Sequence, residues 1–355
     1  MQPVYSAFKL FHYPDRLGAL AQGEMPAPVH VRIKPTNVCN HACYFCAYRR
    51  DDMELGAEMR TRDRISRDKM AEIADDLVEM GVEAVTFSGG GEPLIYPHIA
   101  ETVERLAAGG IRIGCLSNGA MLKGRVAEAF ARHASWLRIS IDGWDDASYA
   151  GYRNTKADAF ERLIDNLTAF SASGTACVLG ASMIVDKDNA GHIVDLGRRL
   201  KATGVAHLKV SPCILSNEGA ESNAYHAPIS GLVQAQIAEA RSALEDDRFQ
   251  IVDHYHDLAE TFERPYSSCP FSQLLTVIGA DLQVYTCQDK AYTESGRLGS
   301  IAERRFRDFW YSAENAQALA AIDPGRDCQH HCVAEAKNRV LVEHLTTHPE
   351  HRAFV

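Results

Sequence analysis

Short apolar runs that alternate with polar residues recur along the first two thirds of the chain, and stretches with helical periodicity separate them. The strand-like runs lie at residues 29–34, 84–88, 111–117, 137–141, 177–184 and 207–211, and the helical patterns lie at residues 67–80, 98–108, 123–133, 157–171 and 190–202. Alternating elements of these lengths are typical of βαβ units that build a parallel sheet. Six units are too few to close a full TIM barrel, so the sequence predicts an α/β fold, a partial (βα)6 TIM-like barrel.

The alternation within the strands places polar residues together on one face. The polar positions of the first, fourth and sixth strands are His30, Arg32 and Lys34, then Arg138, Ser140 and Asp142, then His207, Lys209 and Ser211. If helices cover the apolar faces, these polar side chains line the lumen. Cations outnumber anions among them, which favours an anionic ligand. The alternative is that the cations are ion-paired to Asp142 or Glu92 as scaffolding.

After residue 211 the repeat ends, and the composition changes. A long amphipathic pattern at residues 232–244 is followed by a His/Asp run at 253–257, which we interpret as a linker rather than a metal site. Strand signals at 274–278 and 283–286 flank a turn and predict a hairpin, with a further strand signal at 296–301. We therefore expect an N-terminal arm at 1–28, the barrel at 29–250, a small α+β domain at 251–335, and a helix with a tail at 336–355.

The composition narrows the class of protein. The chain has 355 residues, 46% of them apolar, a net charge of -10 and ten cysteines. It contains no apolar run of about eighteen residues and no apolar signal-peptide core, so we expect a cytoplasmic protein without a membrane partner. The negative charge disfavours nucleic acid as a partner. Cysteines in a reducing compartment indicate metal or redox chemistry rather than disulfides.

Three cysteines follow the first predicted strand with C-x3-C-x2-C spacing: Cys39, Cys43 and Cys46. A structural zinc ion takes four protein ligands, so His41 or a distant cysteine would have to complete a zinc site. An iron–sulfur cube held by three thiolates instead keeps one iron open to a ligand that is not protein. The position of the loop directly after a strand favours the open iron over zinc and over three unrelated buried thiols.

Further motifs lie at the ends of the next three strands. The second strand ends in the turn SGGGEP at 88–93, the third in SNG at 117–119, and the fourth reads RISIDG at 138–143. Glycines let the backbone approach a ligand closely. Because ligands of parallel α/β sheets bind at the carboxyl ends of the strands, these turns and the cysteine loop should lie together.

With these motifs in this order, the chain resembles the radical SAM superfamily. The resemblance implies a [4Fe-4S] cluster on the three cysteines. In that family S-adenosylmethionine chelates the open iron, and its reductive cleavage gives a 5'-deoxyadenosyl radical that abstracts hydrogen. The resemblance implies that Gly90, Gly91 and Glu92 contact the amino group of the cofactor and that Arg153 pairs with its carboxylate. The other implied cofactor-binding residues are Phe45, Asn118 and Ser140. Taken singly, the polar strand-end residues could also be turn residues or helix caps.

The C-terminal part supplies four more thiols, Cys269, Cys287, Cys328 and Cys332. Two flank the predicted hairpin and two form a later C-x3-C loop, which resembles the twitch or shortened SPASM extension of radical SAM enzymes. The resemblance implies one auxiliary [4Fe-4S] cluster. A zinc site is the alternative, since zinc also accepts four thiolates and two histidines lie in the last loop.

The resemblance implies a radical SAM oxidoreductase that is reduced by a protein such as flavodoxin or ferredoxin. We expect dehydrogenation of a polar small molecule: a sugar, an aminocyclitol or a nucleotide-linked sugar. By position alone, Asp142, Lys209 and His207 are candidate bases. The alternatives are a peptide maturase, which the short segment before the first strand disfavours, an epimerase that uses Cys213 as hydrogen donor, and a non-enzymatic iron–sulfur electron carrier or sensor.

Overall fold

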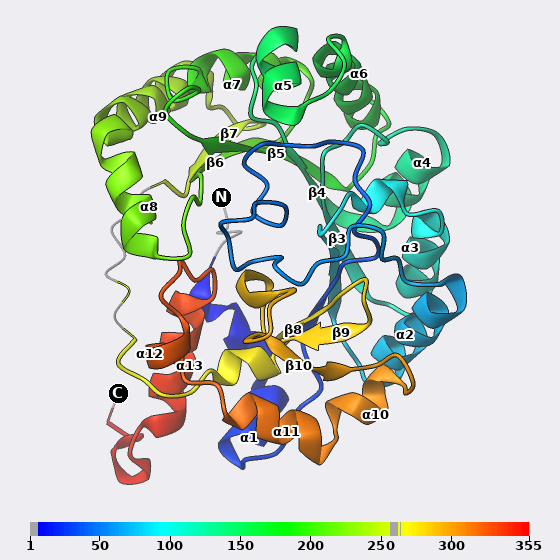
Figure 1. The fold of residues 1–355 in the computed structure, drawn as a ribbon, viewed down its shortest axis with the longest axis vertical. Coiled ribbons are helices and arrows are strands. Elements are labelled where there is room, and N and C mark those ends of the chain that lie inside the picture. Colours follow the sequence, from blue (N-terminus) through cyan, green and yellow to red (C-terminus); the bar gives the residue numbers. More distant parts are fainter. Residues whose placement is uncertain (1–5, 256–261, 263, 355) are drawn as a thin grey trace.

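In the computed structural model, which describes residues 6–255, 262 and 264–354, the described strands form one ten-stranded sheet in the order β10-β9-β8-β1-β2-β3-β4-β5-β6-β7. The strands are β1 (His30–Ile33), β2 (Ala84–Phe87), β3 (Arg112–Ser117), β4 (Ala134–Ser140), β5 (Val178–Val185), β6 (His207–Pro212), β7 (Gln250–Asp253), β8 (Leu275–Ile278), β9 (Gln283–Tyr285) and β10 (Arg297–Ser300). From β1 to β7 all neighbours pair in parallel. The sheet curls into an open ring (Figure 1), which confirms the predicted partial barrel.

Helices surround the outer face of this ring (Figure 1). They are α1 (Pro14–Ala21), α2 (Arg67–Glu79), α3 (Ile99–Ala108), α4 (Gly124–His133), α5 (Asp146–Arg153), α6 (Ala159–Ser171), α7 (Ile193–Ala202), α8 (Gly219–His226), α9 (Ser230–Leu244), α10 (Phe306–Trp310), α11 (Ala313–Ala320), α12 (Pro324–Asp327) and α13 (Glu335–Thr346). The six long helical patterns of the sequence correspond to α2, α3, α4, α6, α7 and α9 within a few residues. The helix expected in the last part of the chain is α13.

The two faces of each strand differ as the alternation predicted. Val31 and Ile33 of β1 are fully buried in the main hydrophobic core together with Ile73 and Leu77 of α2. The intervening polar residues face the inside of the ring. Burial of the apolar set between sheet and helices is the main stabilising contribution to the barrel.

The sheet extends past the predicted barrel in both directions. β7 covers part of the run that we interpreted as a linker, whose residues 256 and 257 lie outside the described residues. Strand β8 of the C-terminal hairpin pairs in parallel with β1, His30 opposite Leu275. β8 and β9 form the predicted antiparallel hairpin. Strands from both sides of the predicted domain boundary at residue 251 therefore belong to one sheet. The division of the chain into four parts stays a prediction.

The N-terminal arm packs against the C-terminal helix. Leu10 and Leu17 form a small apolar cluster with Leu274, which precedes β8, and Leu341 of α13. The arm therefore holds the C-terminal helix against the start of the hairpin. Within the described residues, no helix is long and apolar enough to cross a membrane.

Candidate active site

The loop between β1 and α2 carries the three clustered cysteines across the centre of the ring (Figure 1). Cys39, Cys43 and Cys46 are all free thiols of intermediate exposure, and the Cys46 N–H donates to the Cys43 carbonyl at 3.2 Å. Burial raises the pKa of Cys39 and Cys46. Thiols in such surroundings need a strong local positive charge to ionise, and metal ions supply it. The donor set therefore fits a thiolate-bound iron site.

The glycine-rich turn after β2 packs directly on the chain that enters the cysteine loop. The Gly91 N–H donates to the Thr36 carbonyl at 3.0 Å, and the Glu92 N–H donates to the Val38 carbonyl at 2.9 Å. A Cβ at Gly91 would lie 1.9 Å from the Val38 carbonyl oxygen, and one at Gly90 would lie 2.1 Å from Asn37 Oδ1. Gly91 thus requires glycine because two backbones approach closely there, and Gly90 leaves room for the side chain of Asn37.

Glu92 is 3% exposed, and its carboxylate organises the neighbouring strand end. The Leu94 N–H and the Ser117 hydroxyl donate to Oε1 at 2.9 and 2.7 Å, and the Asn118 N–H donates to Oε2 at 2.7 Å. Burial raises the pKa of Glu92, whereas these hydrogen bonds oppose that rise. Three of the roughly four acceptor positions of the carboxylate are thus in use. One position is left for a ligand such as an ammonium group.

The other strand-end residues predicted to bind cofactor lie along the same edge of the sheet. Asn118 donates through Nδ2 to Asn40 Oδ1 of the cysteine loop at 2.8 Å. Ser140, at the end of β4, lies with its Oγ 3.5 Å from Ser182 Oγ of β5. Asn118 therefore links the third strand to the cysteine loop, and Ser140 lies inside the ring. The cofactor roles of both stay predictions.

Arg153, the last residue of α5, is ion-paired to Asp142, which is fully buried just after β4. Its Nη1 donates to Cys43 Sγ at 3.5 Å, and the guanidinium lies 5.5 Å from the ring centroid of Phe45. Asp142 raises the pKa of Arg153 against the effect of burial. Asp142 also accepts the Ile184 N–H at 2.8 Å. This arrangement favours the scaffolding alternative for Asp142 over the base.

Sequence reasoning missed a cluster beside the cysteine loop. Tyr44 and Tyr152 both donate to Asp186, which follows β5, the latter at 2.8 Å. Cys213, directly after β6, is 2% exposed, and burial and Asp186 raise its pKa to about 12, so it stays a neutral thiol. Asp186 is a polar residue at a strand end, and the rule used for the other strands would have found it.

Inside the ring, Arg138 of β4, Gly180 of β5 and His207 of β6 lie side by side. A Cβ at Gly180 would lie 2.1 Å from the His207 ring, so the glycine leaves room for the imidazole. Burial, Arg138 and Lys209 lower the pKa of His207 to about 4. On β1, burial and Arg138 lower the pKa of Arg32, while Asp289 opposes them. The lumen is therefore a region of concentrated positive charge.

Lys34 connects this lumen to both groups of cysteines. It is 1% exposed and donates to the Tyr48 hydroxyl at 2.8 Å and to the Gly89 carbonyl. Burial and then Arg32 lower its pKa to about 7. Tyr292, after the C-terminal hairpin, lies edge-on to Tyr48 with ring centroids 6.2 Å apart. The sequence placed Lys34 on the lumen face but gave no sign of its tyrosine partners.

The four C-terminal cysteines come together from separate segments. Burial and then Asp289 raise the pKa of both Cys287 and Cys332. The Val333 N–H donates to Asp289 Oδ2 at 3.3 Å, and Asn338 Nδ2 donates to the Ser268 carbonyl at 3.2 Å, so the segments that carry these cysteines adjoin one another. Asp289, His330 and Cys332 also place ligand atoms within 4.8 Å of one another. The donors fit a four-thiolate cluster, and the mixed set keeps zinc possible as the alternative.

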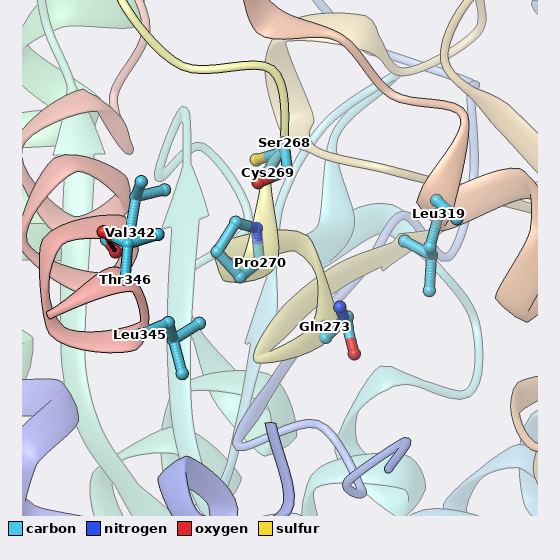
Figure 2. Close-up of a pocket in the computed structure, with 9 residues that line it drawn as sticks. Ser268, Cys269, Pro270, Gln273, Leu319, Val342, Leu345 and Thr346 are labelled. Carbon is cyan, nitrogen blue, oxygen red and sulfur yellow. Dashed lines mark hydrogen bonds between the residues drawn. The ribbon is translucent and has the colours of Figure 1, made fainter. Parts of the chain in front are cut away.

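A small cavity opens beside Cys269 (Figure 2). Its volume is about 150 Å³, and Figure 2 shows Val342 and Leu345 of α13 on one side with Leu319 of α11 on the other. Pockets that hold drug-sized ligands usually measure about 300–1,000 Å³. The cavity is thus too small for a substrate site, and of the four C-terminal cysteines only Cys269 lines it.

A partial barrel with three thiols after β1 and a glycine-rich turn after β2 defines the class of enzymes that hold an iron–sulfur cluster at the carboxyl end of a parallel sheet. The family model described as the radical SAM superfamily matches residues 33–200. Residues 33–200 are therefore a radical SAM domain, in agreement with the predicted resemblance. Members of this superfamily use a [4Fe-4S] cluster and S-adenosylmethionine.

Two curated proteins are similar to this chain in sequence. It is 25% identical over 166 residues to a probable GTP 3',8-cyclase of Halobacterium salinarum, covering 47% of this chain and 45% of that protein. It is 32% identical over 127 residues to neomycin C epimerase of Streptomyces fradiae, covering 36% and 38%. The chain thus spans less than half the length of either relative.

The fold matches Streptococcus suis SuiB bound to S-adenosylmethionine with a TM-score of 0.64 at 15% identity, over 94% of this chain and 80% of that one. At this identity the likeness concerns the fold alone. It covers the C-terminal region as well as the barrel, in agreement with the continuous sheet.

Proposed function

We propose that this chain is a radical SAM oxidoreductase that dehydrogenates a polar small molecule, and that among sugars, aminocyclitols and nucleotide-linked sugars it takes the anionic, nucleotide-linked ones. The observation that carries the proposal is the cationic lumen formed by Arg32, Lys34 and Arg138 between the two groups of cysteines. The similarity to a probable GTP 3',8-cyclase and to neomycin C epimerase supports this substrate class.

In this proposal Cys39, Cys43 and Cys46 hold a [4Fe-4S] cluster that is reduced by a protein such as flavodoxin or ferredoxin. When bound there, S-adenosylmethionine supplies the 5'-deoxyadenosyl radical. The residue that holds the cofactor's carboxylate is Arg153, which the structure keeps buried next to Cys43. Glu92 accepts the ammonium group at its remaining acceptor position.

The polar side chains of the lumen have two roles in this proposal: they orient the substrate, and one of them acts as the base. Buried guanidinium groups form charge-assisted hydrogen bonds with a phosphate or carboxylate and fix the orientation of the substrate. A dehydrogenation also needs a base for the neighbouring proton. Of the three candidates, Asp142 is committed to Arg153, and His207 begins β6 at the end opposite the cysteine loop. We therefore assign the base to the neutral amine of Lys209, in the middle of β6, which takes up the proton, and we assign the second electron to the C-terminal cysteine site.

The test is an anaerobic turnover with deuterated nucleotide sugars and matched neutral sugars. With anionic substrates only, we expect deuterium in 5'-deoxyadenosine and a product about three mass units lighter than the deuterated substrate, because one deuterium and one proton are lost. Lys209→Met should keep deuterium transfer and lose the product, because the radical forms but the proton is not removed. Turnover of neutral sugars alone would overturn the assignment of the lumen as an anion site.

The second candidate function is epimerisation, favoured by the buried thiol of Cys213 and by the epimerase relative. A thiol returns a hydrogen atom readily because its S–H bond is weaker than most C–H bonds. Turnover in deuterium oxide distinguishes the two reactions. An epimerase would place solvent deuterium on the inverted carbon, and Cys213→Ala would abolish the product while cofactor cleavage continues. For a dehydrogenase, Cys213→Ala should act only through packing.

A further inference from the structure

We propose that a second small-molecule site lies on the outer side of the cysteine loop and that it binds a phosphate-bearing ring compound. This site is separate from the lumen and does not rest on the proposed function. A pocket of about 610 Å³ opens there between the cysteine loop, the β3–α4 loop and the α5–α6 segment. Its volume falls within the range of about 300–1,000 Å³ that is typical of ligand sites. Its lining shares no residue with the set predicted to bind S-adenosylmethionine.

Two polar atoms in the wall of this pocket lack partners. His41, between Cys39 and Cys43, is 7% exposed, and its Nδ1 makes no hydrogen bond with any described residue. The hydroxyl of Thr155, also buried, makes none either within the described part of the chain. Buried polar atoms are nearly always hydrogen-bonded. Both residues belong to the lining, so a ligand bound in the pocket can supply a partner to each side chain.

The charges of the lining select an anion. Lys123, Lys156 and Arg162 line the pocket together with a single carboxylate, that of Asp165. Arg162 is paired at 3.0 Å with Asp158, outside the lining. The two lysines form no ion pair among the described residues and lie exposed at the surface. Two ammonium groups, a hydroxyl and an imidazole N–H together are the donors that a phosphate group takes.

The remaining lining suits the body of a ring compound. Met121, Tyr149 and Leu163 provide apolar surface, and Tyr149 is almost fully buried with its ring 6.1 Å from His41 in an edge contact. Ligand sites commonly combine an apolar wall with a few placed polar groups. Since Asn40 also lines the pocket and accepts from Asn118, a ligand bound here contacts the loop that carries the three thiols.

The experiment is isothermal titration of the full-length, anaerobically reconstituted protein with ADP as the probe, repeated with inorganic phosphate. We expect saturable ADP binding that Lys156→Ala and Thr155→Val each weaken about tenfold, the loss of one charge-assisted hydrogen bond. The matched control is Lys187→Ala, which removes an exposed lysine that does not line the pocket and should bind ADP as the wild type does.

Three outcomes would overturn the proposal. The first is no ADP binding, or equal affinity in Lys156→Ala and the wild type. The second is loss of ADP binding in Arg138→Gln, because the probe would then occupy the lumen. The third is competition between ADP and S-adenosylmethionine, which would make the pocket part of the cofactor site. Failure of cofactor cleavage, in contrast, would overturn the proposed function and leave the ADP result standing.

Discussion

At the scale of single residues, Glu92 serves both the fold and the proposed cofactor site. It holds the N–H groups of Leu94 and Asn118 and the hydroxyl of Ser117. Glu92→Ala leaves these buried donors without an acceptor, and each such loss costs about 1–3 kcal/mol. We also expect S-adenosylmethionine affinity to fall about ten- to a hundredfold, because a charge-assisted hydrogen bond is lost.

Denaturant unfolding and equilibrium binding measure these two effects separately. Glu101→Ala is the control, since Glu101 is exposed and pairs with Arg67 on the surface. Exposed pairs of this kind contribute only about 0–1 kcal/mol. Unchanged cofactor affinity in Glu92→Ala, together with a loss of stability, would reduce Glu92 to a packing residue.

Lys34 makes the stability of the protein depend on pH. Its pKa is lowered from 10.5 to about 7 in the folded state by burial. Below about pH 7 both states hold the proton, and the cost of burying the charge is fully present. Between pH 7 and the unfolded value, the unfolded state binds more protons, so the free energy of unfolding rises with pH.

Lys34→Met should remove this contribution. We expect the variant to gain stability relative to the wild type at pH 7 and to show a smaller increase between pH 7 and pH 9 in anaerobic urea unfolding. Lys187→Met, at an exposed lysine, should keep the wild-type slope. An identical slope in both variants would show that Lys34 titrates normally.

Some residues of the candidate site could be predicted from the sequence, and others could not. The three cysteines and the glycine turn could be predicted because their spacing encodes the chemistry locally. The tyrosine partners of Lys34 could not, since Tyr48 and Tyr292 come from segments far apart in the chain. Asp142 was named as a base from its position alone, and only the fold shows that Arg153 occupies it.

At the scale of elements, the turn after β2 and the cysteine loop form one unit. Gly91→Ala would place a methyl group 1.9 Å from the Val38 carbonyl, and backbone cannot move aside cheaply. We expect the cysteine loop to shift, so that the purified variant holds less iron at the first site. Gly18→Ala is the control, because nothing lies within 4 Å of its Cβ and alanine favours helix α1 by about 0.5–1 kcal/mol. Equal iron content in the two variants would show that the turn after β2 does not hold the cysteine loop in place.

The long helices were predicted within a few residues, whereas some short elements, β7 and α5 among them, were not predicted. The period of 3.6 in α2 or α6 extends over three turns or more, so the pattern is unambiguous. β7 has four residues, and α5 has eight. Helix α5 nevertheless had a local sign, the capping box between Asp145 and Ser148, which can be read from the sequence.

At the scale of the whole molecule, the two groups of thiols should hold two clusters. Anaerobically reconstituted protein should contain about eight irons, and replacing Cys39, Cys43 and Cys46 together should leave about four. Cys115→Ala is the control, because this thiol is buried in β3 and should not affect the iron content. About four irons with one zinc in the wild-type protein would show that the C-terminal thiols and His330 hold zinc instead.

The parallel pairing of β1 with β8 has a consequence for how the chain acquires its structure during synthesis. β1 leaves the ribosome first, but its second neighbour follows about 245 residues later, at Leu275. Until then β1 is an open sheet edge, and such edges attract other chains. Contacts of this sequence separation also form slowly. Ribosome-bound chains that end near residue 255 should therefore depend on chaperones to remain monomeric, and this dependence should end once the hairpin has left the exit tunnel.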